Sequence, residues 1–154
     1  MKGNMIVLLS GPNLDLLGVR EPEIYGTDTL DDHVSNANEV AKRLGYVLNH
    51  VQSNYEGDLI KAIHEERSNA IGFIANLGAL SHYSWSIRDA LASFDGPVIE
   101  LHLSNPVSRE SFRHRSVLAS IADGLIAGFG GLGYELAVEA MARLISNRIN
   151  SDES

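Results

Sequence analysis

The chain lacks several residues on which common enzyme mechanisms depend. It contains no cysteine among its 154 residues, which excludes disulfides, thiolate metal ligands and a cysteine nucleophile. It has three lysines, Lys2, Lys42 and Lys61, and none lies in an apolar strand where burial would favour the neutral amine that imine formation needs. It also has no Gly-x-Ser-x-Gly sequence to place a catalytic serine on a strained turn. These absences argue against covalent catalysis.

Charge and hydropathy narrow the expected partners and location. Twenty acidic residues against twelve basic ones give a net charge of −8, so neither nucleic acid nor an anionic membrane is an expected partner. About five apolar residues precede the polar Ser10, which is too few for a signal peptide or a membrane span, and we expect a cytoplasmic protein. With 44% hydrophobic residues, the chain 1–154 is predicted to form one domain with its own core.

Apolar runs alternate with helical periodicity along the chain. The pattern predicts strands at 6–9, 46–51, 70–75, 97–103 and 121–127, and helices at 30–44, 56–67, 82–93 and 135–149. Strands and helices that alternate over short connections favour a parallel sheet with helices on both faces. Five strands in this length favour a single flavodoxin-like α/β domain. The polar residues 150–154 are expected to form a disordered tail.

Polar side chains follow the predicted strands at the points where parallel strands end together. In an open parallel sheet, ligands bind beyond the carboxyl ends of the strands. The residues at this edge are Asn13, Arg20 and Tyr25 after the first strand, 52–57 after the second, Asn76 and His82 after the third, and Glu100, His102, Ser104, Arg109 and Arg113 at or after the fourth. Their convergence predicts a ligand site at this edge.

The long segment 11–26 carries the first candidate catalytic group. Gly18 and Gly26 could hinge it, and a connection of this length is usually either functional or disordered. A fixed cation beside a phenol favours the phenolate, which can act as a base, so Arg20 and Tyr25 are candidate catalytic residues. In the alternative interpretation, Tyr25 covers apolar surface and Arg20 pairs with a neighbouring glutamate, Glu21 or Glu23.

Glu100 and His102 form the second candidate pair. Residues two apart on a strand share a face, and a neighbouring carboxylate favours the protonated imidazole that a general acid requires. The alternatives are a buried ion pair and a zinc site, although no His-x-x-His spacing supports a metal. The remaining histidines have no polar cluster around them and are predicted at the surface or in helix packing: His33, His50, His64 and His114.

The segment Gly128–Gly133 matches the Gly-x-Gly-x-x-Gly motif of dinucleotide-binding folds. In those folds the motif follows the first strand, and an acidic residue ends a later strand. This copy lies near the end of the chain with no strand after it, which favours glycines that allow close packing of strand and helix. A nucleotide-binding regulator of flavodoxin-like fold is the alternative that the motif leaves open.

Six segments together resemble the type II 3-dehydroquinate dehydratases, and the resemblance covers about residues 5–145. They are G-P-N-L-x-L-L-G-x-R-E-P-x-I-Y-G, Q-S-N-x-E-G-x-L-I, N-x-G-A-x-x-H-x-S-x-x-I-R-D-A-L, E-x-H-L-S-N, R-E-x-F-R-H and the G-x-G-x-x-G-Y turn. The resemblance implies a lyase without cofactor or metal that converts 3-dehydroquinate to 3-dehydroshikimate by anti elimination of water through an enolate. That reaction serves both the shikimate pathway to aromatic amino acids and quinate breakdown. The resemblance also implies a homododecamer built from trimers.

The resemblance further implies a role for each matching residue. Tyr25 removes the C2 proton, Arg20 stabilises the charge, Asn13 holds a water against the enolate oxygen, and His102, oriented by Glu100, protonates the leaving C1 hydroxyl. Asn76 and the backbone N–H groups of Leu103 and Ser104 bind the carboxylate, His82, Asp89 and Arg113 bind the ring hydroxyls, and Arg109 supports the lid. His82 and Asp89 are seven residues apart, which predicts that one helix face presents both. The assembly that the resemblance implies would place Asp89 at the site of an adjacent subunit.

Five positions depart from the family's pattern: Asp15, Leu77, Tyr83, Trp85 and Pro106. None has an implied catalytic role, but Tyr83 and Trp85 flank His82 and bear on packing or subunit contacts. The alternative from another functional class is a repurposed relative that binds a small polyhydroxy acid without turnover. Such a protein would lose the base or its arginine, and this sequence retains both Tyr25 and Arg20.

Overall fold

A computed structural model describes residues 3–152, with a five-stranded parallel sheet at its centre. The strand order is β2-β1-β3-β4-β5, which confirms the predicted flavodoxin-like arrangement. The strands are β1 Met5–Ser10, β2 Val47–Gln52, β3 Ala70–Asn76, β4 Val98–His102 and β5 Gly124–Ala127. The α-helices are α1 Pro22–Tyr25, α2 Leu30–Arg43, α3 Glu56–Glu66, α4 Trp85–Ala92 and α5 Leu132–Asp152, and the 3₁₀ turns are η1 Leu14–Leu16, η2 Gly78–His82, η3 Pro106–Ser108 and η4 Ser111–Arg113.

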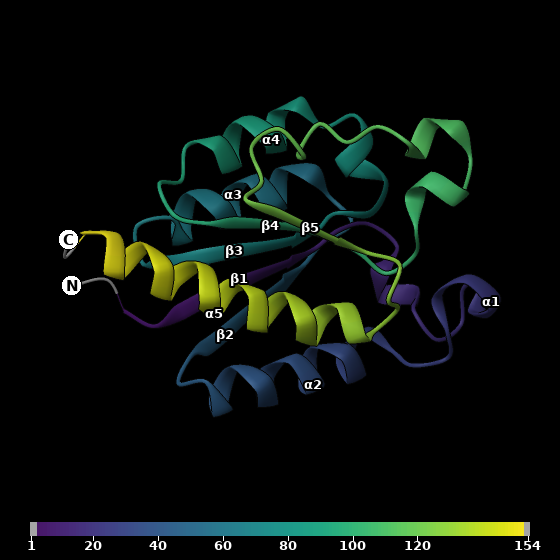
Figure 1. The fold of residues 1–154 in the computed structure, drawn as a ribbon. Helices are drawn as coiled ribbons and strands as arrows, with labels where there is room; N and C mark the ends of the chain where they lie inside the picture. Colours follow the sequence, from purple (N-terminus) through teal and green to yellow (C-terminus); the bar gives the residue numbers. More distant parts are fainter. Residues whose placement is uncertain (1–2, 153–154) are drawn as a thin grey trace.

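The helices cover the sheet in two layers (Figure 1). Helices α2 and α5 lie on one face, and α3 and α4 lie on the other. Because successive side chains of a strand point to opposite faces, Ile6 and Leu8 of β1 enter the α2–α5 core, while Val7 and Leu9 enter the α3–α4 core. Burial on both faces explains the unalternating apolar runs by which the central strands were predicted.

Local signals in the sequence set the ends of the helices. Thr29 begins α2 with a capping box, since its side chain accepts from the Asp32 backbone and the Asp32 carboxylate accepts from the Thr29 backbone. Gly45 adopts a φ of 86° directly after this helix, a left-handed conformation that glycine adopts without strain. The predicted start and stop of the helix at 30–44 are therefore confirmed to within one residue.

Besides α4, which begins at Trp85 rather than at 82, three elements differ from the sequence-based expectations. The last helix continues to Asp152, so residues 150–152 are helical rather than part of a tail, and residues 153–154 lie outside the described chain. Strand β5 begins at Gly124 rather than at 121, because the N–H groups of Ile121 and Ala122 bond back to the Leu118 carbonyl in a turn. The four-residue helix α1 interrupts the segment expected to be a loop.

The glycine-rich turn packs against the α2 layer. A Cβ placed on Gly131 would lie 2.1 Å from Cε1 of the His33 ring, and one on Gly133 would lie 3.0 Å from a Leu101 methyl carbon. Only glycine fits at Gly131 without displacing the ring. These contacts support the packing interpretation of the Gly-x-Gly-x-x-Gly sequence.

The strands all point toward one end of the molecule, where α1, η3 and η4 gather (Figure 1). This is the edge at which the sequence predicted a ligand site. Across residues 3–152, no helix is both long and apolar enough to cross a membrane.

Candidate active site

A cleft opens at the carboxyl edge of the sheet and brings together most of the predicted site residues. It is lined by Pro12, Asn13, Leu14, Arg20, Tyr25, Asn76, Gly78, Ala79, His82, His102, Leu103, Ser104, Pro106, Arg109 and Arg113. Ten of these were predicted from the sequence, whereas Glu100 and Asp89 do not line the cleft. Three of the lining side chains are arginines, in a chain of net charge −8, so the cleft is suited to an anionic ligand.

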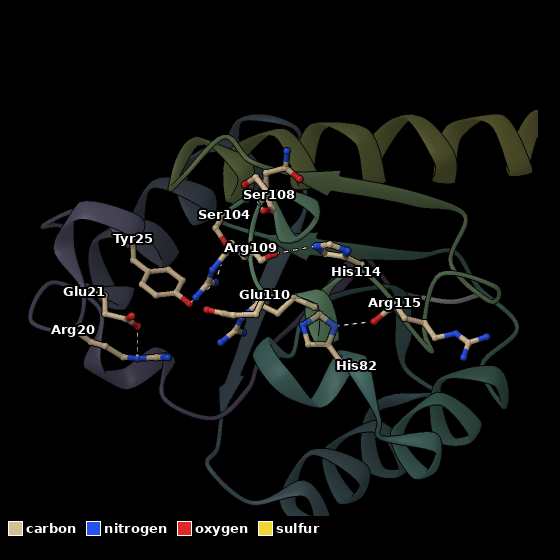
Figure 2. Close-up of polar contacts among 12 residues, drawn as sticks. Arg20, Glu21, Tyr25, His82, Ser104, Ser108, Arg109, Glu110, His114 and Arg115 are labelled. Atoms are coloured by element: carbon tan, nitrogen blue, oxygen red, sulfur yellow. Dashed lines mark hydrogen bonds and ion pairs between the residues drawn. The ribbon is translucent and has the colours of Figure 1, made fainter.

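The Tyr25 hydroxyl is bonded by the arginine that follows β4, whereas Arg20, the arginine nearest in sequence, contacts the Tyr25 ring (Figure 2). Arg109 Nη1 donates to the Tyr25 hydroxyl over 2.7 Å and to Ser104 Oγ over 3.0 Å. Its guanidinium carbon also lies 5.1 Å from the centre of the Tyr25 ring. The His114 ring bonds the Arg109 carbonyl at 3.0 Å, which holds the backbone of this arginine. Because Arg109 comes 84 residues after Tyr25, sequence spacing gave no signal for this contact.

Arg20 has two partners. Its guanidinium carbon lies 5.2 Å from the centre of the Tyr25 ring, which matches the predicted pairing of cation and phenol. Its Nε also lies 3.2 Å from a Glu21 carboxylate oxygen, so the neighbouring-glutamate alternative describes a real contact (Figure 2). Glu21 adopts a φ of 41°, an uncommon conformation for a residue other than glycine, at the start of α1. Arg20 therefore contacts both the Tyr25 ring and Glu21, and its catalytic role stays a prediction.

Glu100 and His102 lie together, as the strand spacing predicted. His102 Nε2 is 3.3 Å from Glu100 Oε1, and Glu100 is fully buried behind the imidazole. Ser116, which the sequence analysis did not single out, donates its hydroxyl to Glu100 Oε1. The same Ser116 Oγ accepts from the backbone N–H groups of Leu118 and Ala119, which fixes its position. The Glu100 carboxylate is thus held by Ser116, which lies in a loop that no sequence motif identified.

His82 faces the cleft as a neutral ring. Its Nδ1 bonds the Arg115 carbonyl at 2.8 Å, so Nδ1 carries the proton (Figure 2). Burial lowers the pKa of His82, and the Arg115 bond opposes that shift. Nε2 is then left with a lone pair and can accept a hydrogen bond from a ligand hydroxyl. The ring also stacks on His102 with 6.0 Å between centres.

The asparagines of the cleft are fixed by their neighbours. Asn76, at the end of β3, donates Nδ2 to the hydroxyl of Tyr134 over 2.7 Å. Asn13 adopts a φ of 69°, and its backbone N–H donates to the Asn54 side chain over 2.9 Å. The Leu103 carbonyl accepts from Gly130 over 2.9 Å, which holds the strand end next to Ser104.

Arg113 lines the cleft but also has an internal partner. Its Nε bonds a Glu110 carboxylate oxygen three residues away, and this bond is the main cause of a lowered pKa for the Glu110 carboxyl. The pairing restrains the direction of the Arg113 side chain and leaves the other guanidinium nitrogens as donors.

Asp89 does not share a helix face with His82, so the prediction that one helix presents both is wrong. His82 belongs to η2, and α4 begins only at Trp85, because Ser84 caps it by accepting from Ile87 N at 3.2 Å. The Asp89 side chain is 74% exposed, outside the cleft of its own chain, and pairs with Arg88 at 3.0 Å.

Besides His114, which bonds the Arg109 carbonyl, two histidines expected to have no polar role make specific contacts. His33 is buried and stacks on Tyr134 with 5.7 Å between ring centres, which fits the prediction of helix packing. His50 is half-buried on β2 and lies 2.8 Å from Ser10 Oγ, which the sequence did not suggest. Within residues 3–152, no three histidine or carboxylate side chains come together as metal ligands.

Comparison with known proteins places this cleft in a family. A family model described as "Dehydroquinase class II" matches residues 4–142, nearly the whole chain. The chain belongs to the class II dehydroquinase family. A relative from Bacillus licheniformis, named 3-dehydroquinate dehydratase, is 53% identical over 133 residues, which are 86% of this chain and 92% of the relative. A relative from Phaeosphaeria nodorum, named catabolic 3-dehydroquinase, is 49% identical over 140 residues, 91% of this chain and 92% of the relative.

Solved structures of class II dehydroquinases agree with this assignment. The crystal structure of a type II dehydroquinase from Propionibacterium acnes superimposes with a TM-score of 0.87 at 41% sequence identity. The match covers 92% of this chain and 98% of the other. Fold and family predicted from the sequence are both confirmed.

Proposed function

We propose that this protein is a type II 3-dehydroquinate dehydratase, which eliminates water from 3-dehydroquinate to give 3-dehydroshikimate. The observation that carries the proposal is the meeting of Tyr25, Arg109 and His102 in one arginine-lined cleft. A phenol, a cation that contacts it and an imidazole backed by a carboxylate supply a base, a charge stabiliser and an acid for one elimination. The same dehydration serves the shikimate pathway and quinate breakdown, so the proposal covers either role.

In the first step, Tyr25 takes the proton from C2, next to the ketone of the substrate. The electron pair of the broken C–H bond moves toward the carbonyl oxygen and gives an enolate. Arg109 and Arg20 stabilise the phenolate before the step, and a water held by Asn13 donates to the enolate oxygen. Removal of a proton beside a ketone requires a base but no cofactor.

In the second step, His102 protonates the C1 hydroxyl as its bond to carbon breaks. The enolate electrons return to form the carbon–carbon double bond, and water leaves. Glu100 orients the imidazole, and Ser116 orients Glu100. The cycle closes when Tyr25 releases its proton and His102 regains one.

The remaining cleft residues bind the substrate. Asn76 and the N–H groups of Leu103 and Ser104 bind its carboxylate, and Arg113 donates to its ring hydroxyls. Neutral His82 accepts from a ring hydroxyl through Nε2. Hydrogen bonds to a polyhydroxy ring select this class of acid over a plain carboxylic acid, because buried polar groups left unpaired cost binding energy.

Assembly and location belong to the same proposal. We propose a homododecamer built from trimers, in which Asp89 acts on the cleft of an adjacent subunit. Support comes from the exposure of Tyr83 and Trp85, 61% and 63%, beside a carboxylate that faces away from its own cleft. The cysteine-free composition suits a reducing compartment, and a cytoplasmic location is part of the proposal.

The test is direct. Purified protein is mixed with 3-dehydroquinate, and the ultraviolet absorbance of the conjugated enone of the product is followed with time. We expect steady formation of product, and none with a Tyr25→Phe variant prepared in parallel. Binding of 3-dehydroquinate without product formation would instead identify a relative that has lost the reaction.

A further inference from the structure

A chain of hydrogen bonds runs from the cleft into the interior beneath the first turn of α5. Asn76 Nδ2 donates to the Tyr134 hydroxyl over 2.7 Å, and the Ser10 side chain bonds the same hydroxyl. Ser10 Oγ in turn lies 2.8 Å from His50 Nε2. Asn76, Ser10 and Tyr134 are all buried, so water does not compete for these bonds. The mechanism above uses Asn76 but none of the three residues behind it.

Two bonds converge on the Tyr134 hydroxyl. Burial raises the pKa of Tyr134 to about 12, so its hydroxyl keeps its proton, and the bonds from Asn76 and Ser10 oppose that shift, as bonds donated to its oxygen do. Ser10 Oγ also lies 2.8 Å from His50 Nε2, and burial lowers the pKa of the His50 ring. The Tyr134 hydroxyl is therefore held between Asn76 on the cleft side and Ser10 on the inner side.

The bond between Nδ2 and the Tyr134 oxygen fixes the orientation of the Asn76 carboxamide. Both groups are buried, so loss of this bond would leave an unpaired polar atom in the interior, which is unfavourable. With Nδ2 on Tyr134, the second hydrogen of Nδ2 remains available for a ligand in the cleft.

We propose that Tyr134 is a positioning residue for substrate binding, which, with Ser10 and His50 behind it, fixes the orientation in which Asn76 donates to the substrate carboxylate. The inference rests on the proposed role of Asn76 in the dehydratase reaction. A purely structural role for Tyr134 is separable from it, because the Tyr134 ring also stacks on His33 and packs in the α2–α5 core. The hydroxyl is the part that concerns Asn76.

The first experiment is Tyr134→Phe, which keeps the ring and removes only the hydroxyl. We expect KM for 3-dehydroquinate to rise about tenfold, the usual cost of one hydrogen bond to a charged group, with kcat changed less than about threefold. The carboxylate does not react, so its contacts act equally in the ground state and the transition state. Ser10→Ala removes the next link and is expected to raise KM in the same direction by a smaller factor. Tyr46→Phe is the matched control, a half-buried phenol against the same core and outside the cleft.

The second experiment is a double-mutant cycle with Asn76→Ala. If Tyr134 acts through Asn76, adding Tyr134→Phe to Asn76→Ala changes KM by less than about twofold. A structural defect would instead multiply independently with the loss of Asn76. Multiplicative effects, or an unchanged KM in Tyr134→Phe itself, would overturn the proposal.

A third measurement does not depend on turnover. Crystal structures of the wild-type protein and of Tyr134→Phe are compared at Asn76, and we expect the carboxamide to rotate or to occupy two orientations in the variant. An unmoved Asn76 contradicts the proposal. A wild-type protein that forms no product contradicts the proposed function instead, and the crystallographic comparison still decides whether Tyr134 orients Asn76.

Discussion

Arg109 donates a 2.7 Å hydrogen bond to the hydroxyl of Tyr25, so the residue proposed as the base is held by a cation from the far side of the cleft. The contact ties the α1 segment to the loop after β4, two parts of the chain that meet only in the folded protein. Together, Arg20 and Arg109 give Tyr25 two neighbouring guanidinium groups, one from a residue before it in the sequence and one from a residue after it.

Tyr25→Phe keeps the aromatic ring and removes the proposed proton acceptor. We expect kcat to fall by at least ~10²-fold, the lower range for loss of a general base, while thermal stability stays near that of the wild type. Steady-state kinetics and thermal unfolding measure the two quantities. Tyr55→Phe, an exposed tyrosine outside the cleft, is the control and should retain wild-type kcat. Retention of more than a tenth of wild-type kcat by Tyr25→Phe would reject Tyr25 as the base.

Arg109→Gln removes the cation that touches the Tyr25 hydroxyl, and we expect kcat to fall at least ~10-fold. Arg20→Gln is predicted to cost less, because Glu21 at 3.2 Å already offsets part of the Arg20 charge. Measurement of kcat for both variants decides the order. A larger loss for Arg20→Gln would show that the two arginines exchange roles when substrate binds.

His102→Ala removes the proposed acid, and we expect kcat to fall by about 10²-fold or more, with one titration lost from the pH–rate profile. Glu100→Gln keeps the shape of the side chain that lies 3.3 Å from His102 and is expected to be milder, at about tenfold. Comparison of the two pH–rate profiles checks the assignment. Equal losses would indicate that the two residues titrate as one unit.

Acid should destabilise the fold through His50. Burial lowers the pKa of His50 in the folded protein, and nearby Asp31 opposes the shift. The unfolded chain therefore binds the proton more readily, and stability falls as the pH drops below about 6.5 and through the lowered folded value. His82, whose pKa is also lowered, adds to the same trend. His50→Gln should reduce the loss of stability between about pH 7 and pH 5, as measured by chemical denaturation.

The exposed His64 of α3 provides the control for this measurement. His64→Gln is expected to lose stability with acid as the wild type does, because the residue is not withdrawn from water. If His50→Gln and the wild type lose equal stability between the two pH values, the burial of His50 does not explain the acid sensitivity.

Asp89→Ala tests the proposed assembly. The side chain faces away from its own cleft, so we expect activity to fall only if a neighbouring subunit uses it. Analytical ultracentrifugation over a dilution series, with activity measured at each concentration, should show that activity is lost as the assembly dissociates. A stable, fully active monomer would contradict both the assembly and the role of Asp89 across subunits.

The sequence predicted the centre of the sheet well because strands β1, β3 and β4 are buried on both faces. In a chain whose strands alternate with helices, an unbroken apolar run such as Ile6–Leu9 indicates a central strand. The short helix α1 was not predicted, since four residues are too few for a helical period. The single helix expected over 82–93 is divided at Ser84, whose capping hydrogen bond a hydropathy pattern does not reveal.

The candidate site was also predicted only in part: most of its residues were predicted, but the contacts between residues far apart in the sequence were not. Residue types at the strand ends predicted which side chains line the cleft, because parallel strands end together. The pairings among them depend on tertiary contacts, and these were missed where the partners are far apart in sequence. Arg109 on Tyr25, Ser116 on Glu100 and Tyr134 on Asn76 are the three examples.

The seating of α5 on β3 has a consequence for anyone who wishes to redesign this enzyme. A Cβ on Gly72 would lie 2.3 Å from the Met141 sulfur, so even the smallest side chain there forces the flexible Met141 side chain to move. The same helix carries Tyr134 two turns earlier, against Asn76. A mutant library aimed at new substrates should therefore leave position 72 as glycine, so that the Met141 side chain and the packing of α5, which carries Tyr134, on the sheet are kept.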